Sequence, residues 1–145
     1  MTDPLLDSRL AGEAEFLAAR AAAVGSALAN RELRELGLRV RSYSVLSLAS
    51  EAQPPTQRQL ADFLRLDPSQ IVALVDELET AGLIRREADP GDRRSRIVVA
   101  TAEGRRLRAR AAKAARVAED EALAPLTVHE RAQLTALLRR IAFPS

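Results

Sequence analysis

Two short helical segments, separated by only two or three residues, constrain the fold of this chain more than any other feature. The first begins at Thr56, which is followed three residues later by Gln59 in the pattern of a capping box. The second begins at Asp67, which is followed directly by a proline and three residues later by Gln70. Each cap contributes about 1 kcal/mol to helix stability. Residues 56–80 are therefore predicted to form a helix-turn-helix.

The hydrophobic period changes after Gly82, where the second helix is expected to end. Residues 83–88 and 96–100 are typical of β-strands. The intervening residues 89–95 are rich in Asp, Pro, Gly and Ser, which favour turns. A small β-hairpin is therefore predicted to follow the helix-turn-helix, in a fold that is otherwise mainly α-helical.

Further helices are expected on both sides of this unit. Residues 9–30 place apolar side chains at alternating steps of four and three residues, which is the spacing of a helix stripe. A second helix is expected over residues 40–52, and a third from the cap residue Thr101 to about residue 122. Thr127 and Glu130 form another capping box, which predicts a last helix.

The charge of the chain is unevenly distributed. Twenty-two basic and twenty acidic residues leave a net charge of only +2. Residues 82–118 nevertheless carry eleven basic and four acidic residues, so the positive charge gathers on the hairpin and the helix after it. For residues 105–116, a solvated helix face laced with ion pairs is as good an interpretation as DNA contact. Arg93 and Arg94 are expected to project from the turn, where arginine can enter a minor groove.

Several classes of function are excluded by composition. The chain has no cysteine and one histidine, His129, which rules out a thiolate metal site, a thiol redox sensor and a multi-histidine metal site. No paired-carboxylate motif is present, so we expect neither an enzyme nor a protein that holds a metal or cofactor. His129 is expected to be exposed or to cap the last helix. The first residues show no basic region followed by an apolar stretch, and no apolar run approaches about 20 residues, so we expect a cytoplasmic protein without a membrane partner.

The order and spacing of these elements resemble the MarR family of winged helix-turn-helix regulators. The motifs that carry the resemblance are TQRQLA (56–61), LDPSQ (66–70), LVDELE (74–79), GLIR (82–85), DPGDRR (89–94) and TAEG (101–104). The resemblance covers nearly the whole chain and implies a single domain over residues 1–145. Within it, residues 38–101 would form the winged helix-turn-helix, with the wing at 83–101. Residues 1–35 and 102–145 would supply the dimerisation helices.

This resemblance also implies a function and partners. A family member is a homodimer that binds double-stranded DNA, and its two recognition helices reach successive major grooves about 34 Å apart. The operator is therefore expected to be a pseudo-palindrome. The expected function is sequence-specific regulation of transcription, as a repressor that a small-molecule effector releases from DNA. Phe16, Arg20, Tyr43 and Leu46 are the expected pocket residues, although core packing explains Phe16 and Leu46 equally well.

The expected DNA contacts come from the two short helices and the wing. Gln70 is expected to pair with adenine, and Ser69 to reach a phosphate or a base edge. Val72 and Ala73 stand where many family members carry threonine and arginine, and they are expected to touch thymine methyl groups. Asp92 is expected to orient an arginine of the wing by a charge-assisted hydrogen bond. The expected set of DNA-contacting residues is Thr56, Arg58, Ser69, Gln70, Ala73, Arg93 and Arg94.

Two departures from the family pattern bear on this interpretation. The expected recognition helix, residues 68–80, has no basic residue. This favours an alternative function, a winged-helix module that binds another protein and no DNA. Arg65 stands where the family often has glycine, which predicts either an altered turn or an added phosphate contact.

Overall fold

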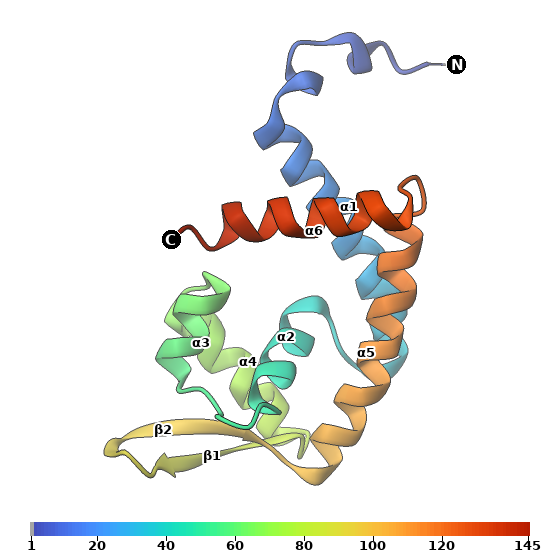
Figure 1. Ribbon diagram of the computed structural model, residues 1–145. Helices are drawn as coiled ribbons and strands as arrows, with labels where there is room; N and C mark the ends of the chain where they lie inside the picture. The colour runs from blue at the N-terminus through green and yellow to red at the C-terminus, as the bar shows by residue number, and fades with distance from the viewer. Residues whose placement is uncertain (1) are drawn as a thin grey trace. The chain divides into compact units, whose positions relative to one another are not determined.

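The computed structural model describes residues 2–145 and is mainly helical, with one antiparallel β-hairpin (Figure 1). The predicted fold class is therefore confirmed. The elements are three short 3-10 helices (Pro4–Asp7, Leu10–Gly12 and Arg34–Leu36), α1 (Ala14–Leu33), α2 (Val40–Ala49), α3 (Gln57–Leu64), α4 (Pro68–Thr80), β1 (Ile84–Asp89), β2 (Asp92–Ala100), α5 (Ala102–Ala122) and α6 (Val128–Ala142).

The described chain divides into two compact units. The first combines the residues up to Leu28 with Arg116–Ser145, and the second comprises Ala29–Ala115. The second unit holds α2, α3, α4 and the hairpin around a continuous apolar core. Its most deeply buried large side chains are Leu33, Val45, Leu46, Leu60, Ile71, Val75, Ile84 and Val98. In the first unit, α6 has no buried residue.

The helix-turn-helix is defined by the local hydrogen bonds that the sequence predicts. Thr56 Oγ1 accepts the Gln59 N–H at 3.1 Å, and Gln59 Oε1 accepts the Thr56 N–H at 2.9 Å. At the start of α4, Gln70 Oε1 accepts the Asp67 N–H at 3.1 Å. The helix α3 ends at Arg65, whose backbone is left-handed with φ 54° and ψ 46°. This conformation is the one that favours glycine, and it turns the chain toward α4.

The hairpin has a tighter turn than predicted. Only residues 90–91 lie between β1 and β2, and Asp89 pairs directly with Asp92. Asp89 Oδ1 accepts the Gly91 N–H at 2.9 Å, which closes the turn. The prediction that residues 89–95 form the turn is therefore wrong, because β2 already begins at Asp92. Arg93, Arg94 and Ser95 lie in β2 between the pairs Asp89–Asp92 and Ala88–Arg96, where the register of the hairpin shifts. The residues before α3 also join this sheet, since the Val98 N–H donates to the Pro55 carbonyl at 2.8 Å.

Two predicted helix ends are also wrong. The first long helix begins at Ala14 rather than at residue 9, because Leu10 lies in a short 3-10 helix that ends at Gly12. Glycine lowers helix stability, and Glu13 is extended, with ψ 127°. The helix α2 ends at Ala49 rather than at residue 52, since the Ser50 hydroxyl donates to the Leu46 carbonyl at 2.8 Å.

The helix α5 starts where the hairpin returns to the body of the second unit. Thr101 Oγ1 donates to the Gly82 carbonyl at 2.7 Å and accepts the Gly104 N–H at 3.0 Å. A Cβ atom at Gly104 would lie 1.9 Å from the Leu83 carbonyl oxygen, so the close approach requires glycine. The hairpin is thus anchored at its base to the first turn of α5.

Candidate nucleic-acid interface

The helix α4 buries one face and exposes the other. Ile71, Leu74, Val75 and Leu78 are buried in the core of the second unit, as the apolar spacing predicts. The opposite side presents the residues expected to contact DNA, together with one acidic residue: Ser69, Gln70, Val72, Ala73 and Asp76. Contact between these residues and DNA stays a prediction.

Gln70 has a local role that limits its expected pairing with adenine. A two-bond pairing uses both the amide oxygen and the amide nitrogen. The amide oxygen already accepts the Asp67 N–H at 3.1 Å. The oxygen has a second lone pair, so pairing through both atoms remains possible, but the bond to Asp67 restricts the orientation of the side chain. Near α3, Thr56 is half-buried at the helix start and Arg58 is exposed.

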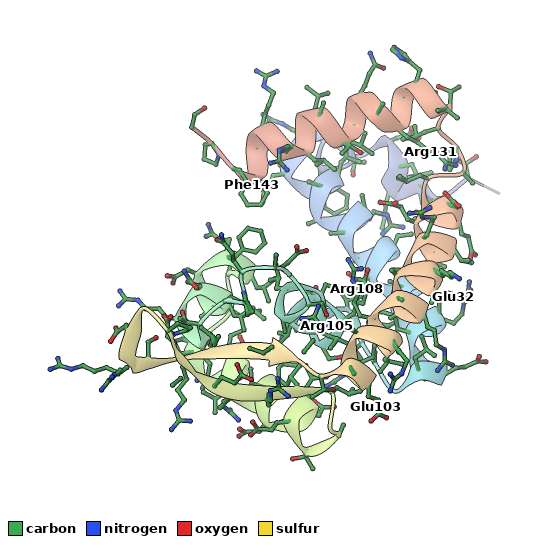
Figure 2. All side chains as sticks on the ribbon, turned by 60° about the horizontal axis from the view of Figure 1, so that its bottom comes forward. Glu32, Glu103, Arg105, Arg108, Arg131 and Phe143 are labelled. Atoms are coloured by element: carbon green, nitrogen blue, oxygen red, sulfur yellow. The ribbon has the colours of Figure 1, made fainter. Side chains whose placement is uncertain are left out.

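The hairpin forms an exposed arm that extends from the helices (Figure 1). Arg93 and Arg94 are both exposed on β2, and nitrogen-tipped side chains spread from the far end of the hairpin (Figure 2). Asp92 Oδ1 accepts the backbone N–H of Arg94 at 3.0 Å. The carboxylate thus bonds the backbone of Arg94, and the expected bond to an arginine side chain is not formed among the described residues. Asp92 shapes the strand start near the tip.

Arg86 is the most connected polar residue of this region, and sequence reasoning missed it. Its Nε donates to Gln57 Oε1 at 2.8 Å, its Nη1 to Glu79 Oε1 at 2.8 Å and its Nη2 to Asp76 Oδ1 at 2.5 Å. Its backbone N–H also donates to Glu79 Oε2 at 3.0 Å. One side chain thus joins β1 to both helices of the helix-turn-helix. The available signal was the three-residue spacing of Asp76 and Glu79, which places two carboxylates on one helix face.

The basic residues of α5 form no ion pair within residues 2–145. These residues are Arg105, Arg106, Arg108, Arg110, Lys113 and Arg116, and the ion pairs of the described chain all lie elsewhere. The expected ion pairs are therefore not formed by these residues, whereas most of their side chains are exposed to solvent as expected for a solvated face. Arg105 instead donates to the Ser50 carbonyl at 2.8 Å, at the end of α2. The uncompensated cations keep a positive field along α5.

The residues expected to line an effector pocket lie in both units. Leu46 is fully buried in the core of the second unit, and Tyr43 packs against that core. Phe16 is half-buried on α1 of the first unit. Arg20 borders a cavity of about 300 Å³ in the first unit, whose other lining residues are Leu17, Ala21, Val24, Ala122 and Leu123. The pocket itself stays a prediction.

Two buried polar atoms in the second unit lack a hydrogen-bond partner among the described residues. They are Ser47 Oγ on α2 and Arg108 Nε on α5. Arg105 and Arg108 are one turn apart on α5 and are both labelled in Figure 2. Buried polar atoms are normally satisfied, so each of these two could bind a polar group or a water molecule.

Residues 2–145 contain neither a cluster typical of a metal site nor a helix that could cross a membrane. No cluster of His, Cys, Asp or Glu in this range has the arrangement of a metal site. In the same range, no helix is both long enough and apolar enough to cross a membrane. His129 is exposed in the first turn of α6.

Comparison with known proteins identifies the family. The sequence profile of the MarR family matches residues 38–95. A MarR-family transcriptional regulator from Rhodococcus sp. RHA1 has 42% sequence identity and a TM-score of 0.89, over 95% of this chain and 99% of that one. CouR from Rhodococcus jostii RHA1, solved with p-coumaroyl-CoA bound, has 42% identity and a TM-score of 0.86, over 96% and 98% of the two chains.

A curated relative extends the similarity to a named repressor. The transcriptional repressor Rv2887 of Mycobacterium tuberculosis is 28% identical over 126 residues, which are 87% of this chain and 91% of that protein. A structure of Rv2887 with p-aminosalicylic acid covers 91% of this chain, with 26% identity and a TM-score of 0.75. The winged helix-turn-helix geometry and these likenesses agree, and the chain belongs to the MarR family of DNA-binding transcriptional regulators.

Proposed function

We propose that the protein is a homodimeric repressor that binds a pseudo-palindromic operator and leaves it when an aromatic acyl effector binds. One observation carries this proposal. The second unit exposes the outer face of α4 and also the hairpin, whose strand β2 bears Arg93 and Arg94. The arm suits the minor groove, and α4 has the length and exposed face of a major-groove helix. CouR and Rv2887 have the same overall fold.

Dimerisation is supported by the apolar surface of the first unit. Ile141 is 76% exposed and Leu5 is 71% exposed, and other large apolar side chains are exposed with them: Leu6, Leu10, Leu17, Val24, Val117, Leu137, Leu138 and Phe143. Soluble proteins rarely leave so many clustered apolar side chains in water. A second copy of the chain would cover them in a two-fold interface, which pairs two winged units. A pseudo-palindromic operator would match this symmetry.

The effector class is proposed from the relatives and from the polar atoms of α2 and α5. The ligands in the CouR and Rv2887 structures share an aromatic ring and negative charge. In this chain, Ser47 Oγ and Arg108 Nε are buried without partners, and the cations of α5 are uncompensated. An aromatic carboxylic acid or its CoA thioester fits this environment, because both offer acceptor oxygens and negative charge.

Operator binding is tested with a duplex that the wild-type protein selects from a random pool. We expect a pseudo-palindromic sequence, one dimer per duplex, and a steep fall of log K with log salt concentration. Binding with no salt dependence, or no selected sequence, would contradict the proposal. The first alternative would then be the protein-interaction module, which the acidic character of α4 favours.

The effector is tested by adding p-coumarate or p-coumaroyl-CoA to the protein–operator complex. Release by the free acid alone identifies the aromatic carboxylate as the recognised group. Release by the thioester alone identifies the CoA moiety as part of the ligand. Benzyl alcohol serves as the uncharged control, and release by it at the same concentration would contradict recognition of a negative charge.

A further inference from the structure

The charge of the recognition helix differs from what a DNA-contacting element needs. The helix α4 carries three carboxylates, Asp76, Glu77 and Glu79, and no basic residue. Carboxylates that face a duplex are repelled by its phosphates, which occur once per about 1.7 Å of helix axis. Without nearby positive charges, these carboxylates would therefore lower the affinity of α4 for DNA.

Each of these carboxylates is paired with an arginine that comes from outside α4. Arg86 of β1 holds Asp76 at 2.5 Å and Glu79 at 2.8 Å. Arg39, which precedes α2, lies 3.7 Å from Glu77. The two bonds of Arg86 are short enough for charge-assisted hydrogen bonds, whereas the Arg39 contact is longer and more exposed. Arg86 is therefore the principal counter-ion of α4.

The environment of Arg86 distinguishes it from a surface ion pair. Its side chain is 21% exposed, whereas that of Asp76 is 61% exposed. The guanidinium is thus held behind the carboxylates, and Gln57 of α3 accepts its remaining Nε donor. Three of its five N–H donors thus bind protein acceptors. Arg86 is therefore placed to offset the charge of α4 through the carboxylates of the helix.

We propose that Arg86 is a positioning residue that serves as the internal counter-ion of the recognition helix. It offsets one of the two negative charges of Asp76 and Glu79, and it fixes both carboxylates against β1, so that α4 and the wing approach DNA together with less negative charge on the helix. This inference rests on the proposed contact between α4 and the operator. It assigns to Arg86 a role through the carboxylates rather than through a phosphate.

The test is a rescue experiment on the duplex selected by the wild-type protein. Arg86→Met removes the counter-ion, and we expect operator affinity to fall about tenfold or more. Adding Asp76→Asn and Glu79→Gln to this variant removes the uncompensated charges, and we expect most of the lost affinity to return. Such recovery is the non-additivity expected of residues that act through one another. Arg85→Met is the matched control, because Arg85 is the neighbouring β1 residue and pairs only with Glu87.

A second variant keeps the inference testable if Arg86→Met does not fold. Asp76→Asn with Glu79→Gln in the wild-type background leaves Arg86 charged and removes the repulsion. We expect binding at least as tight as wild type with an unchanged salt slope, because carboxylate repulsion is removed and no phosphate contact is added. Thermal unfolding is measured for every variant, and operator affinities are compared only at temperatures where each variant is folded. A loss of affinity then reports binding rather than unfolding.

The outcomes separate this inference from the proposed function. Wild-type protein that binds no duplex contradicts the proposed function, and the inference fails with it. If the wild-type protein binds the duplex but the triple variant shows no recovery, the inference alone is overturned. Arg86 would then act by holding β1 against the helices or by contacting a phosphate, and neither role is restored when Asp76 and Glu79 become amides. An equal loss in Arg85→Met also overturns it, because the effect would then be one of total charge.

Discussion

The turn between α3 and α4 contains a backbone conformation whose energetic cost can be measured directly. Arg65 is the one non-glycine residue among residues 2–145 with positive φ, at φ 54° and ψ 46°. For a residue with a Cβ atom, this left-handed conformation costs roughly 1–2 kcal/mol. Glycine removes that cost but adds about 0.4–1 kcal/mol of unfolded-state entropy. Arg65→Gly is therefore expected to stabilise the protein by about 0.5–1 kcal/mol.

The assay is reversible thermal unfolding followed by circular dichroism. For a chain of this length, 1 kcal/mol shifts Tm by roughly 2–4 °C, so we expect a rise of about 1–4 °C. Arg65→Ala is the matched control, because alanine removes the guanidinium and keeps the Cβ atom. Its Tm should stay at or below the wild-type value. A lower Tm for Arg65→Gly would refute the reasoning and would show that the Arg65 side chain stabilises the turn.

The same two variants examine the expected phosphate contact of Arg65. If the guanidinium binds a phosphate, both variants lose operator affinity and their salt slopes fall by about one. The glycine variant would then be more stable and bind more weakly. Unchanged slopes would show that the arginine is tolerated in the turn without contributing to DNA binding.

Three further predictions concern the wing, the base of α5 and the cap of α6. Arg94→Ala should reduce operator affinity by about 1–3 kcal/mol at fixed salt, and unchanged binding in a gel-shift titration would remove this arginine from the interface. Gly104→Ala should lower stability by about 1–3 kcal/mol, since its Cβ would meet the Leu83 carbonyl, whereas Gly25→Ala, with open space around it, should leave Tm unchanged or raise it. Hydrogen bonds from the backbone and, to a lesser extent, the hydroxyl of Thr127 lower the pKa of Glu130. The cap should therefore stabilise α6 fully at pH values above the pKa of this carboxyl in the unfolded chain, and this stabilisation should be lost as pH falls through its pKa in the folded protein. A carboxyl titration followed by NMR, with Glu130→Gln as control, checks this, and an ordinary or raised pKa would contradict it.

The elements that sequence predicted best depend on contacts between near neighbours. The capping boxes of Thr56 with Gln59 and of Thr127 with Glu130 form as expected, because each joins residues only three positions apart. The left-handed turn at Arg65 was not predicted, because an arginine stands where the family resemblance leads one to expect glycine. Helix starts can therefore be derived from this sequence with little knowledge of the tertiary fold.

The errors have a common physical origin in contacts between distant residues. The predicted turn was too wide because Asp, Gly and Ser favour turns locally, whereas the pairing of Asp89 with Asp92 depends on strand alignment. The contact between Arg86 and Gln57 joins residues 29 positions apart, and no local pattern predicts it. Asp92 bonds the backbone N–H of Arg94 instead of the expected arginine side chain. Sequence thus located the candidate interface but not the bonds that join its parts.

The absence of basic residues on α4 first favoured a module that binds no DNA. In the folded second unit, however, the charge near α4 also depends on two arginines from outside the helix, one on β1 and one just before α2. Arg86 and Arg39 pair with all three carboxylates of the helix. The local charge therefore approaches neutrality, while Arg93 and Arg94 remain exposed on β2. A helix that is acidic in sequence can thus approach a polyanion when its neighbours supply the counter-ions, so its composition alone is not evidence against DNA binding.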